Sequence, residues 1–295
     1  DAGAWDFDKY AVASYGHNVS PKVKQADITQ MTYQDMPYAD VWTFGFPCQD
    51  LSVAGKQAGL FEGKRSGLFF EVMRLLDETI ENDIDSLPSI IMAENVKGLK
   101  PYLGVLEEEY KKRGYKMYLT LYNSKYWGVP QNRERYFVVG VHESIDKEFI
   151  FPEQQESYVP RLSTILESEV DEKYYISDEK ASKVIEQANQ KIGLKQTHGV
   201  IVKGDIMTRN NPQRQHGFSR ETCFTLRTAV QHGCIDNDLR VRKLTPTEYK
   251  RLQGFPETFE LVVSDSQAYK QFGNAVTVNV SRAIAERIKM FLLSL

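Results

Sequence analysis

Two reactive side chains each follow a short apolar run. Cys48 comes directly after Pro47 at the end of "VWTFGFPC", and Glu94 closes the run "SIIMAE". A cysteine attacks as its thiolate, so a nucleophilic cysteine needs cationic or dipolar surroundings that lower its pKa. A glutamate that shares a proton near neutral pH needs burial that raises its pKa. Together the two residues predict nucleophilic catalysis, whereas each alone also fits a buried thiol or a helix cap.

The stretch "GVPQNRERYFVVG" adds a cationic face. Gln131, Arg133 and Arg135 alternate along it, and the two-residue repeat of a strand would place all three side chains on one side. Two arginines on one face are costly unless they meet an anion or a polar ligand. The pattern therefore indicates either a site for such a ligand or a pair of surface salt bridges.

Two acidic residues near the N-terminus suit a nucleotide-like ligand. Asp6 follows the run "AGAW", and Asp27 lies in "ADITQM". An acid at the end of the first strand of a βαβ unit accepts hydrogen bonds from ribose hydroxyls, and a second acid suits the amino group of adenine. Since aspartate also caps helices frequently, both assignments are hypotheses.

The elements that would position these residues alternate between strands and helices up to Val141. Apolar runs predict strands over residues 40–46, 89–95, 116–123 and 135–141, and amphipathic spacing predicts helices over residues 66–82 and 105–114. This alternation indicates an α/β fold with βαβ units and a mostly parallel sheet. Sites form beyond the carboxyl ends of such strands, so we expect Cys48 and Glu94 to converge there.

The pattern changes after Val141 and predicts a second domain. Short β-rich pieces follow, with eleven Lys or Arg and five Asp or Glu between Lys195 and Arg251, in a chain of net charge −3. This local positive excess indicates polyanion binding if the basic side chains share a face, or an ordinary solvated surface otherwise. A final apolar helix is expected to rejoin the first domain. We predict a first domain of residues 1–160 and 263–295 and a second of residues 161–262.

Composition excludes several classes of protein. No apolar run reaches the ~18–20 residues of a membrane-spanning helix, and the N-terminal stretch has no signal-peptide pattern. The three cysteines, Cys48, Cys223 and Cys234, are widely spaced and form no CxxC pair, which disfavours a disulfide framework or structural zinc. We expect no metal and a reducing, cytoplasmic location.

Taken together, the motifs resemble those of the DNA (cytosine-5) methyltransferase family of bacterial and phage restriction-modification systems. The matching stretches, in the family's order, are "GFPCQDLSVAGKQ", "AENVKG", "GVPQNRERYFVVG", "RKLTPTEYKRLQGFPETF" and "SQAYKQFGNAVTVNV". Five motifs in register over nearly the whole chain make chance similarity very improbable. The resemblance implies a Rossmann-like α/β domain that uses S-adenosylmethionine, with a smaller β-rich target-recognition domain.

The resemblance assigns the chemistry to four residues. Cys48 would attack C6 of a cytosine flipped out of double-stranded DNA, and Glu94 would support protonation at N3. Arg133 and Arg135 would position the ring, C5 would take the methyl group, and loss of the C5 proton would release the enzyme. A soft nucleophile, an acid and a cationic face are also what activation of an electron-poor pyrimidine requires.

The resemblance also implies contacts to the methyl donor, which leaves as S-adenosylhomocysteine. The two N-terminal acids and their neighbours match contacts to ribose and adenine, and an Asn-Ala pair matches the methionine end. The full set of matched positions is Asp6, Phe7, Asp27, Ile28, Pro47, Leu68, Asn274 and Ala275.

DNA contacts are expected from the loop after the catalytic cysteine and from the second domain. The second domain holds a Thr-Leu landmark of the family and a Gln/Arg-rich run, and these side-chain types suit adenine and guanine edges. The candidate residues are Gln49, Ser52, Lys56, Arg65, Gln213, Arg214, Gln215, Thr225, Leu226 and Arg227.

One motif of the family has no match. The aromatic-x-Gly-x-Gly loop that holds the cofactor is absent from this sequence, so we expect upstream residues or a separate chain to supply it. Two alternatives stay open: a tRNA cytosine-5 methyltransferase, which shares the same motifs, and an inactive or split chain that binds DNA without turnover. For the leading interpretation we expect a monomer in a prokaryotic or phage-infected cell, partnered by a cognate restriction endonuclease.

Overall fold

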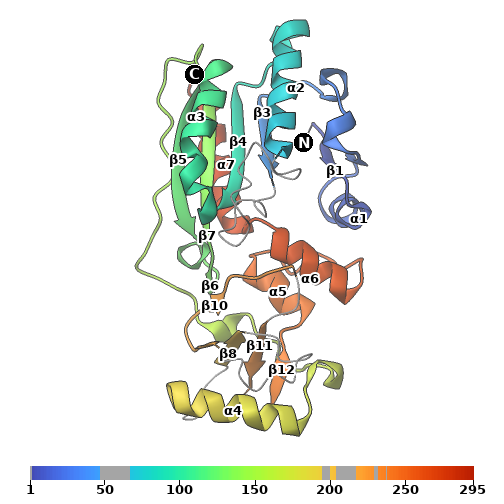
Figure 1. Ribbon diagram of the computed structural model, residues 1–295, viewed down its shortest axis with the longest axis vertical. Helices are drawn as coiled ribbons and strands as arrows, with labels where there is room; N and C mark the ends of the chain where they lie inside the picture. The colour runs from blue at the N-terminus through green and yellow to red at the C-terminus, as the bar shows by residue number, and fades with distance from the viewer. Residues whose placement is uncertain (1, 47–66, 195–199, 204–216, 229–231, 237) are drawn as a thin grey trace. The chain divides into compact units, whose positions relative to one another are not determined.

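The computed structural model describes residues 2–46, 67–194, 200–203, 217–228, 232–236 and 238–295 (Figure 1). The chain divides into two units. Unit 1 comprises Asp1–Tyr122, Glu134–Pro152 and Ile284–Leu295, and unit 2 comprises Asn123–Arg133 and Glu153–Ala283. Because the chain changes units after residue 133, Gln131 and Arg133 belong to unit 2 and Arg135 belongs to unit 1.

Unit 1 alternates strands and helices along the chain. Its elements are β1 (Ala4–Asp6), α1 (Lys9–Asn18), β2 (Val23–Gln25), β3 (Val41–Gly45), α2 (Leu68–Asn82), β4 (Ile90–Val96), α3 (Leu103–Lys112), β5 (Tyr115–Asn123) and β7 (Glu134–His142). In the described part of the chain, β1 and β2 form a parallel pair, and the main sheet has the order β3-β4-β7-β5. The α/β fold class expected from the sequence is confirmed.

The main sheet is mixed, which corrects the expectation of a mostly parallel one. β3 and β4 run parallel, but β4 and β7 run antiparallel. A parallel connection needs a crossover of about a dozen or more residues, usually a helix. The link between the neighbouring strands β5 and β7 covers only residues 124–133 and contains no α-helix, so the chain turns back into the sheet.

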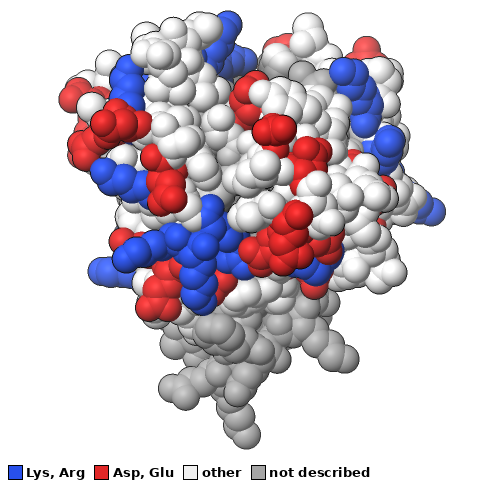
Figure 2. Space-filling view, turned by 90° about the horizontal axis from the view of Figure 1, so that it is seen from above, with Lys and Arg blue, Asp and Glu red and all other residues white. Residues whose placement is uncertain are grey.

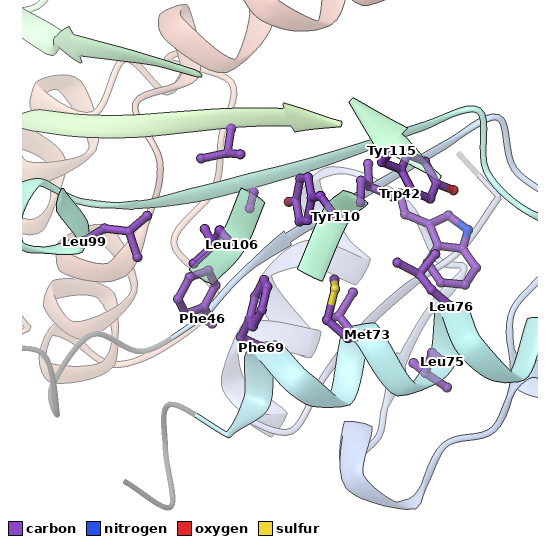
Figure 3. Close-up of a cluster of buried hydrophobic side chains, with 14 of the residues drawn as sticks. Trp42, Phe46, Phe69, Met73, Leu75, Leu76, Leu99, Leu106, Tyr110 and Tyr115 are labelled. Atoms are coloured by element: carbon purple, nitrogen blue, oxygen red, sulfur yellow. The ribbon is translucent and has the colours of Figure 1, made fainter. Parts of the chain in front are cut away.

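The core of unit 1 lies between the sheet and α2. Apolar side chains recur at helical spacing in α2, and Figure 3 shows Phe69 and Met73 pointing toward the strands. Phe46, the residue after β3, packs in the same cluster as Trp42, and its ring centroid lies 5.3 Å from that of Phe69. Burying an apolar side chain of this size contributes about 1.5–3 kcal/mol, so α2 anchors the end of β3.

Unit 2 is built around a small antiparallel sheet with the order β12-β11-β8-β9. Its elements are β6 (Gln131–Asn132), α4 (Asp178–Ile192), β8 (Val200–Lys203), β9 (Gly217–Ser219), β10 (Cys223–Phe224), β11 (His232–Ile235), β12 (Val241–Lys243), α5 (Pro246–Leu252) and α6 (Asp265–Asn274). β6 and β10 form a parallel pair. One buried cluster joins Leu226, Cys234 and Tyr249 to Phe272 of α6.

The last helix, α7 (Val278–Leu292), begins in unit 2 and continues into unit 1 from Ile284. Val280, Ile284 and Ile288 are all buried, as expected for a stripe with a spacing of four residues. Within the described ranges, no helix is both long and apolar enough to cross a membrane.

Candidate active site

An acid and an arginine meet at the end of β4. The antiparallel register pairs Val96 with Arg135, so Glu94, two residues before Val96, lies on the same face of the sheet as Arg135. Arg135 Nε lies 3.1 Å from Glu94 Oε1, and each side chain is only 13% exposed. Such a shielded pair interacts more strongly than a pair in open water. The arginine therefore fixes the orientation of the carboxyl group.

The end of β3 lies beside this pair. The parallel register sets Gly45 opposite Glu94, so the chain leaves β3 at the level of the acid. The carbonyl of Phe46 accepts a hydrogen bond from the buried Asn95 Nδ2 at 3.2 Å. Phe46 is thus held by its backbone here and by its ring in the core, and the Pro-Cys dipeptide follows it directly in the sequence.

Several predicted residues lie outside the described part of the chain. They come from the loop after β3 and from the Gln/Arg-rich run of unit 2: Pro47, Cys48, Gln49, Ser52, Lys56, Arg65, Gln213, Arg214 and Gln215.

The other two cysteines are unsuited to nucleophilic attack. Cys223 in β10 and Cys234 in β11 are both 0% exposed. Burial raises the pKa of Cys223 far above its usual value and that of Cys234 to about 12. Neither thiol would ionise near neutral pH, so Cys48 is the candidate nucleophile that remains among the three cysteines.

The two N-terminal acids lie at adjacent strand ends. β1 and β2 are parallel, with Asp6 opposite Gln25, so Asp27 follows the end of β2 beside the end of β1. The N–H and then the hydroxyl of Thr29 donate to Asp27 Oδ1 at 3.0 and 2.9 Å, and these bonds lower its pKa. The ring of Phe7 is 71% exposed. Carboxylate acceptors beside an open aromatic ring fit the hydroxyl groups and base of an adenosine.

An arginine of α2 holds this cluster in place. Arg74 donates from Nη2 to the Ile28 carbonyl at 3.0 Å and forms ion pairs with Glu71 and Glu78 at 2.8 and 2.6 Å. These pairs have i,i+3 and i,i+4 spacing, which orients the guanidinium on the helix. Leu68, the first residue of α2, is half-buried.

Arg133 and Gln131 contact a different set of groups from Arg135. Arg133 is 2% exposed and donates to the carbonyls of Leu226, Gly273 and Ala275 at 3.3, 3.2 and 2.9 Å. Gln131 Oε1 accepts the N–H of Leu226 at 3.1 Å. The structure therefore joins Arg135 to Glu94, whereas Arg133 and Gln131 bind the backbone of unit 2.

The described residues of the predicted recognition region differ in exposure. Leu226 is buried and Arg227 is exposed, and Thr225 Oγ1 donates to the Asn132 carbonyl at 2.7 Å. At the end of α6, Asn274 is exposed and Ala275 is half-buried. The polar side chain of Asn274 and the cationic side chain of Arg227 are therefore accessible to a ligand.

Charges of both signs are interspersed on the face shown in Figure 2, where Lys and Arg side chains lie beside Asp and Glu side chains. The described residues of that face do not form a uniformly basic surface. No group of three or more His, Cys, Asp and Glu that could hold a metal ion occurs in the described ranges.

A family model for C-5 cytosine-specific DNA methylases matches residues 2–290. The chain belongs to this family. Among its relatives, the type II methyltransferase M.NlaX of Neisseria lactamica is 35% identical, over 96% of this chain and 87% of the relative. The type II methyltransferase M1.ScrFI of Lactococcus lactis subsp. cremoris is 34% identical, over 96% of this chain and 70% of the relative. The crystal structure of S. pombe Dnmt2 methyltransferase shares the fold, with a TM-score of 0.69 and 20% identity, covering 100% of this chain and 92% of that one.

The protein is thus a DNA (cytosine-5) methyltransferase of the restriction-modification type, in a family that uses S-adenosylmethionine. Sequence reasoning alone left the side-chain amides of two buried residues of this methyltransferase, Asn95 and Gln253, without a role. Asn95 lies inside the matching stretch "AENVKG", and Gln253 lies inside "RKLTPTEYKRLQGFPETF". Their motifs mark both positions, but only the folded chain identifies the carbonyl groups that their amides bind.

Proposed function

We propose that this methyltransferase modifies C5 of a cytosine in a specific short duplex sequence, through a covalent bond between Cys48 and C6 of the ring. The observation that carries the proposal is the Glu94–Arg135 pair beside the end of β3. The chain leaves β3 at the level of the acid, and Cys48 follows three residues after Gly45. A nucleophile and an acid from neighbouring strand ends suit addition to a pyrimidine.

Each side chain has a defined task in this scheme. The Cys48 thiolate forms the S–C6 bond, and Glu94 supports protonation at N3, which accepts the electron density that the attack displaces. Arg135 holds the Glu94 carboxyl group toward the ring. S-adenosylmethionine supplies the methyl group from a positively charged sulfur. Loss of the C5 proton then returns an electron pair to the ring, and the S–C6 bond breaks to free Cys48.

For the methyl donor, we propose Asp6 as the ribose contact and Phe7, Asp27 and Ile28 as the adenine contacts. The exposed Phe7 ring and the paired carboxylates at the ends of β1 and β2 support this assignment. The remaining donor contacts proposed from the family motifs are Pro47, Leu68, Asn274 and Ala275.

For DNA, the target base must leave the stack, because the enzyme cannot reach C6 inside a duplex. We propose that Thr225 and Arg227 contact DNA at the segment fixed by the buried Leu226. The other proposed DNA contacts are Gln49, Ser52, Lys56, Arg65, Gln213, Arg214 and Gln215. We further propose that the enzyme acts as a monomer in the cytoplasm of a prokaryotic or phage-infected cell, alongside a cognate restriction endonuclease.

Methyl transfer from labelled S-adenosylmethionine tests the substrate and the nucleophile together. Protein expressed from its complete gene should label duplex DNA and not tRNA, and Cys48→Ser should abolish labelling while DNA binding persists. Cys234→Ala is the matched control, because it removes a buried, un-ionised thiol and should retain activity. Label in tRNA alone would refute the DNA assignment, and substantial turnover by Cys48→Ser would refute the covalent mechanism.

A trapping experiment tests the bond itself. Bisulfite sequencing of DNA from cells that express the complete gene identifies the target, and a duplex with 5-fluorocytosine at that position is then incubated with enzyme and S-adenosylmethionine. Fluorine at C5 cannot leave as a proton does, so the adduct with Cys48 should survive denaturation. No adduct with the correct target would contradict the scheme.

A further inference from the structure

Three buried side chains of unit 2 bind the backbone of two segments that are distant from them in sequence. Gln131, Arg133 and Gln253 are 0%, 2% and 0% exposed. None of them is adjacent in sequence to the segments that hold residues 226 and 272–275. We call residues 225–228 the recognition segment and residues 272–275 the donor segment, after the ligands proposed for them above.

The recognition segment is fixed at both polar groups of one residue. The Leu226 N–H donates to Gln131 Oε1 at 3.1 Å, and the Leu226 carbonyl accepts from Arg133 Nη1 at 3.3 Å. A residue whose buried N–H and carbonyl are both hydrogen-bonded cannot shift without losing a hydrogen bond in an apolar environment. The position of this segment therefore depends on these two side chains.

The donor segment is fixed by the same arginine and by Gln253. Arg133 Nη2 donates to the carbonyls of Gly273 and Ala275 at 3.2 and 2.9 Å. Gln253 Nε2 donates to the carbonyls of Phe272 and Ala275 at 2.5 and 3.1 Å. Gln131 Nε2 also donates to Gln253 Oε1 at 3.3 Å, which closes the connection between the two segments.

The segments also touch directly at a glycine. A Cβ on Gly273 would lie 2.4 Å from both the carbonyl carbon and the oxygen of Arg227 and 2.6 Å from the Thr228 nitrogen. Backbone atoms cannot move aside as a flexible side chain could. Only glycine therefore allows α6 to approach the recognition segment this closely.

We infer that Gln253, together with Arg133 and Gln131, is a positioning residue that sets the donor segment and the recognition segment in one arrangement. The inference rests on the proposed function for the identity of the two ligands. In this arrangement Arg133 acts by binding main-chain carbonyls of unit 2. It also predicts that a change at Gln253 weakens the binding of both the methyl donor and DNA, because both segments lose their common support.

The test compares two variants of the full protein that both remove buried hydrogen bonds. Gln253→Glu keeps the size of the side chain but turns an acceptor toward the Phe272 and Ala275 carbonyls. Thr277→Val, the matched control, removes the Thr277 Oγ1 bonds to Gln253 Oε1 and Ser124 Oγ, at 3.0 and 2.7 Å, and leaves the carbonyl contacts in place. Thermal unfolding and the Kd values of S-adenosylhomocysteine and target duplex are measured for each.

Gln253→Glu should raise both Kd values about tenfold or more, whereas Thr277→Val should lower the unfolding midpoint and leave both Kd values within about twofold. Equal effects of the two variants on binding, or unchanged binding in Gln253→Glu, would overturn the inference. If Gln253→Glu does not fold, Gly273→Ala decides: it removes no side-chain hydrogen bond, so a raised Kd for duplex supports the inference and an unchanged Kd refutes it.

The binding measurements also separate this inference from the proposed function. Wild-type protein that binds both ligands but transfers no label would refute the proposed reaction, and the variants would still decide the positioning role. Wild-type protein that binds neither ligand would refute both.

Discussion

Replacing Glu248 by glutamine should destabilise unit 2 strongly, although the side chain keeps its shape. Glu248 of α5 and Arg242 of β12 form two parallel hydrogen bonds of 2.8 and 2.7 Å, with the side chains 0% and 2% exposed. The same carboxylate accepts the N–H groups of Thr245 and Glu167 at 2.8 and 3.0 Å. Glutamine would remove the charge and present an amide donor to groups that are themselves donors.

The size of the effect follows from burial. Removing one partner of a buried ion pair leaves the other charge without compensation and costs about 3–5 kcal/mol. Unit 2 offers a matched control of the same chemistry, because Arg240 and Glu172 also form two parallel bonds, at 2.8 and 2.6 Å, but are 47% and 74% exposed. Water solvates the exposed pair in either state, so Glu172→Gln should cause no resolvable loss.

Urea unfolding followed by fluorescence measures both variants. Trp127 is the one tryptophan of unit 2 among the three in the chain, so a background with Trp5→Phe and Trp42→Phe reports on unit 2. The Glu248→Gln midpoint should fall well below that of Glu172→Gln at an unchanged slope. Equal midpoints would refute the reasoning. Arg242→Met combined with Glu248→Leu should recover most of the loss, because both buried charges disappear together.

Three further outcomes are expected. Glu94→Gln should lower kcat by about 10²–10⁴-fold, because an amide cannot share a proton with N3 of the ring. A kcat within roughly threefold of wild type would contradict the acid role. Burial, and then the nearby cations Lys203 and Arg227, hold the pKa of His232 at about 4. Only the unfolded state takes up this proton as the pH falls from about 6.5 to 4, so the free energy of unfolding should fall by up to about 3 kcal/mol over that range. His232→Gln should flatten this part of the profile of unfolding free energy against pH. Gly140→Ala should destabilise unit 1 by about 1–3 kcal/mol, since its Cβ would lie 2.8 Å from Ile91 and 2.9 Å from Tyr110, and an unchanged urea midpoint would show that the core can yield.

The local hydrophobic pattern predicted the positions of several strands and helices. The strands over residues 40–46, 89–95 and 135–141 correspond to β3, β4 and β7 within a residue or so at each end. The helix expected to end near Gly114 stops at Lys112, and Gly114 has a φ of +74°, a backbone conformation typical of a glycine just after a helix. The pattern did not predict strand direction, because side chains alternate with the same two-residue period in parallel and antiparallel strands.

The sequence predicted which residues belong to the candidate site better than it predicted the groups that those residues contact. Motif spacing selected Glu94 and Arg135, and the fold places them 3.1 Å apart. Asn95 and Gln253 could not be given roles from the sequence, because each acts on main-chain carbonyls. Every residue carries such a carbonyl, so only the tertiary fold determines which one a given amide meets.

Arg133 and Arg135 lie in one short motif but bind different groups. A regular strand would direct both side chains to the same face, but Arg133 lies in the break between β6 and β7, where the chain changes units. Arg135 is inside β7 and meets the single carboxylate of Glu94, which leaves that acid oriented by a charge. Arg133 meets three carbonyls, which are neutral, so its guanidinium binds backbone segments without neutralising an acid. The two arginines therefore act within separate units, Arg135 on an acid of unit 1 and Arg133 on the backbone of unit 2, although only Glu134 lies between them in the sequence.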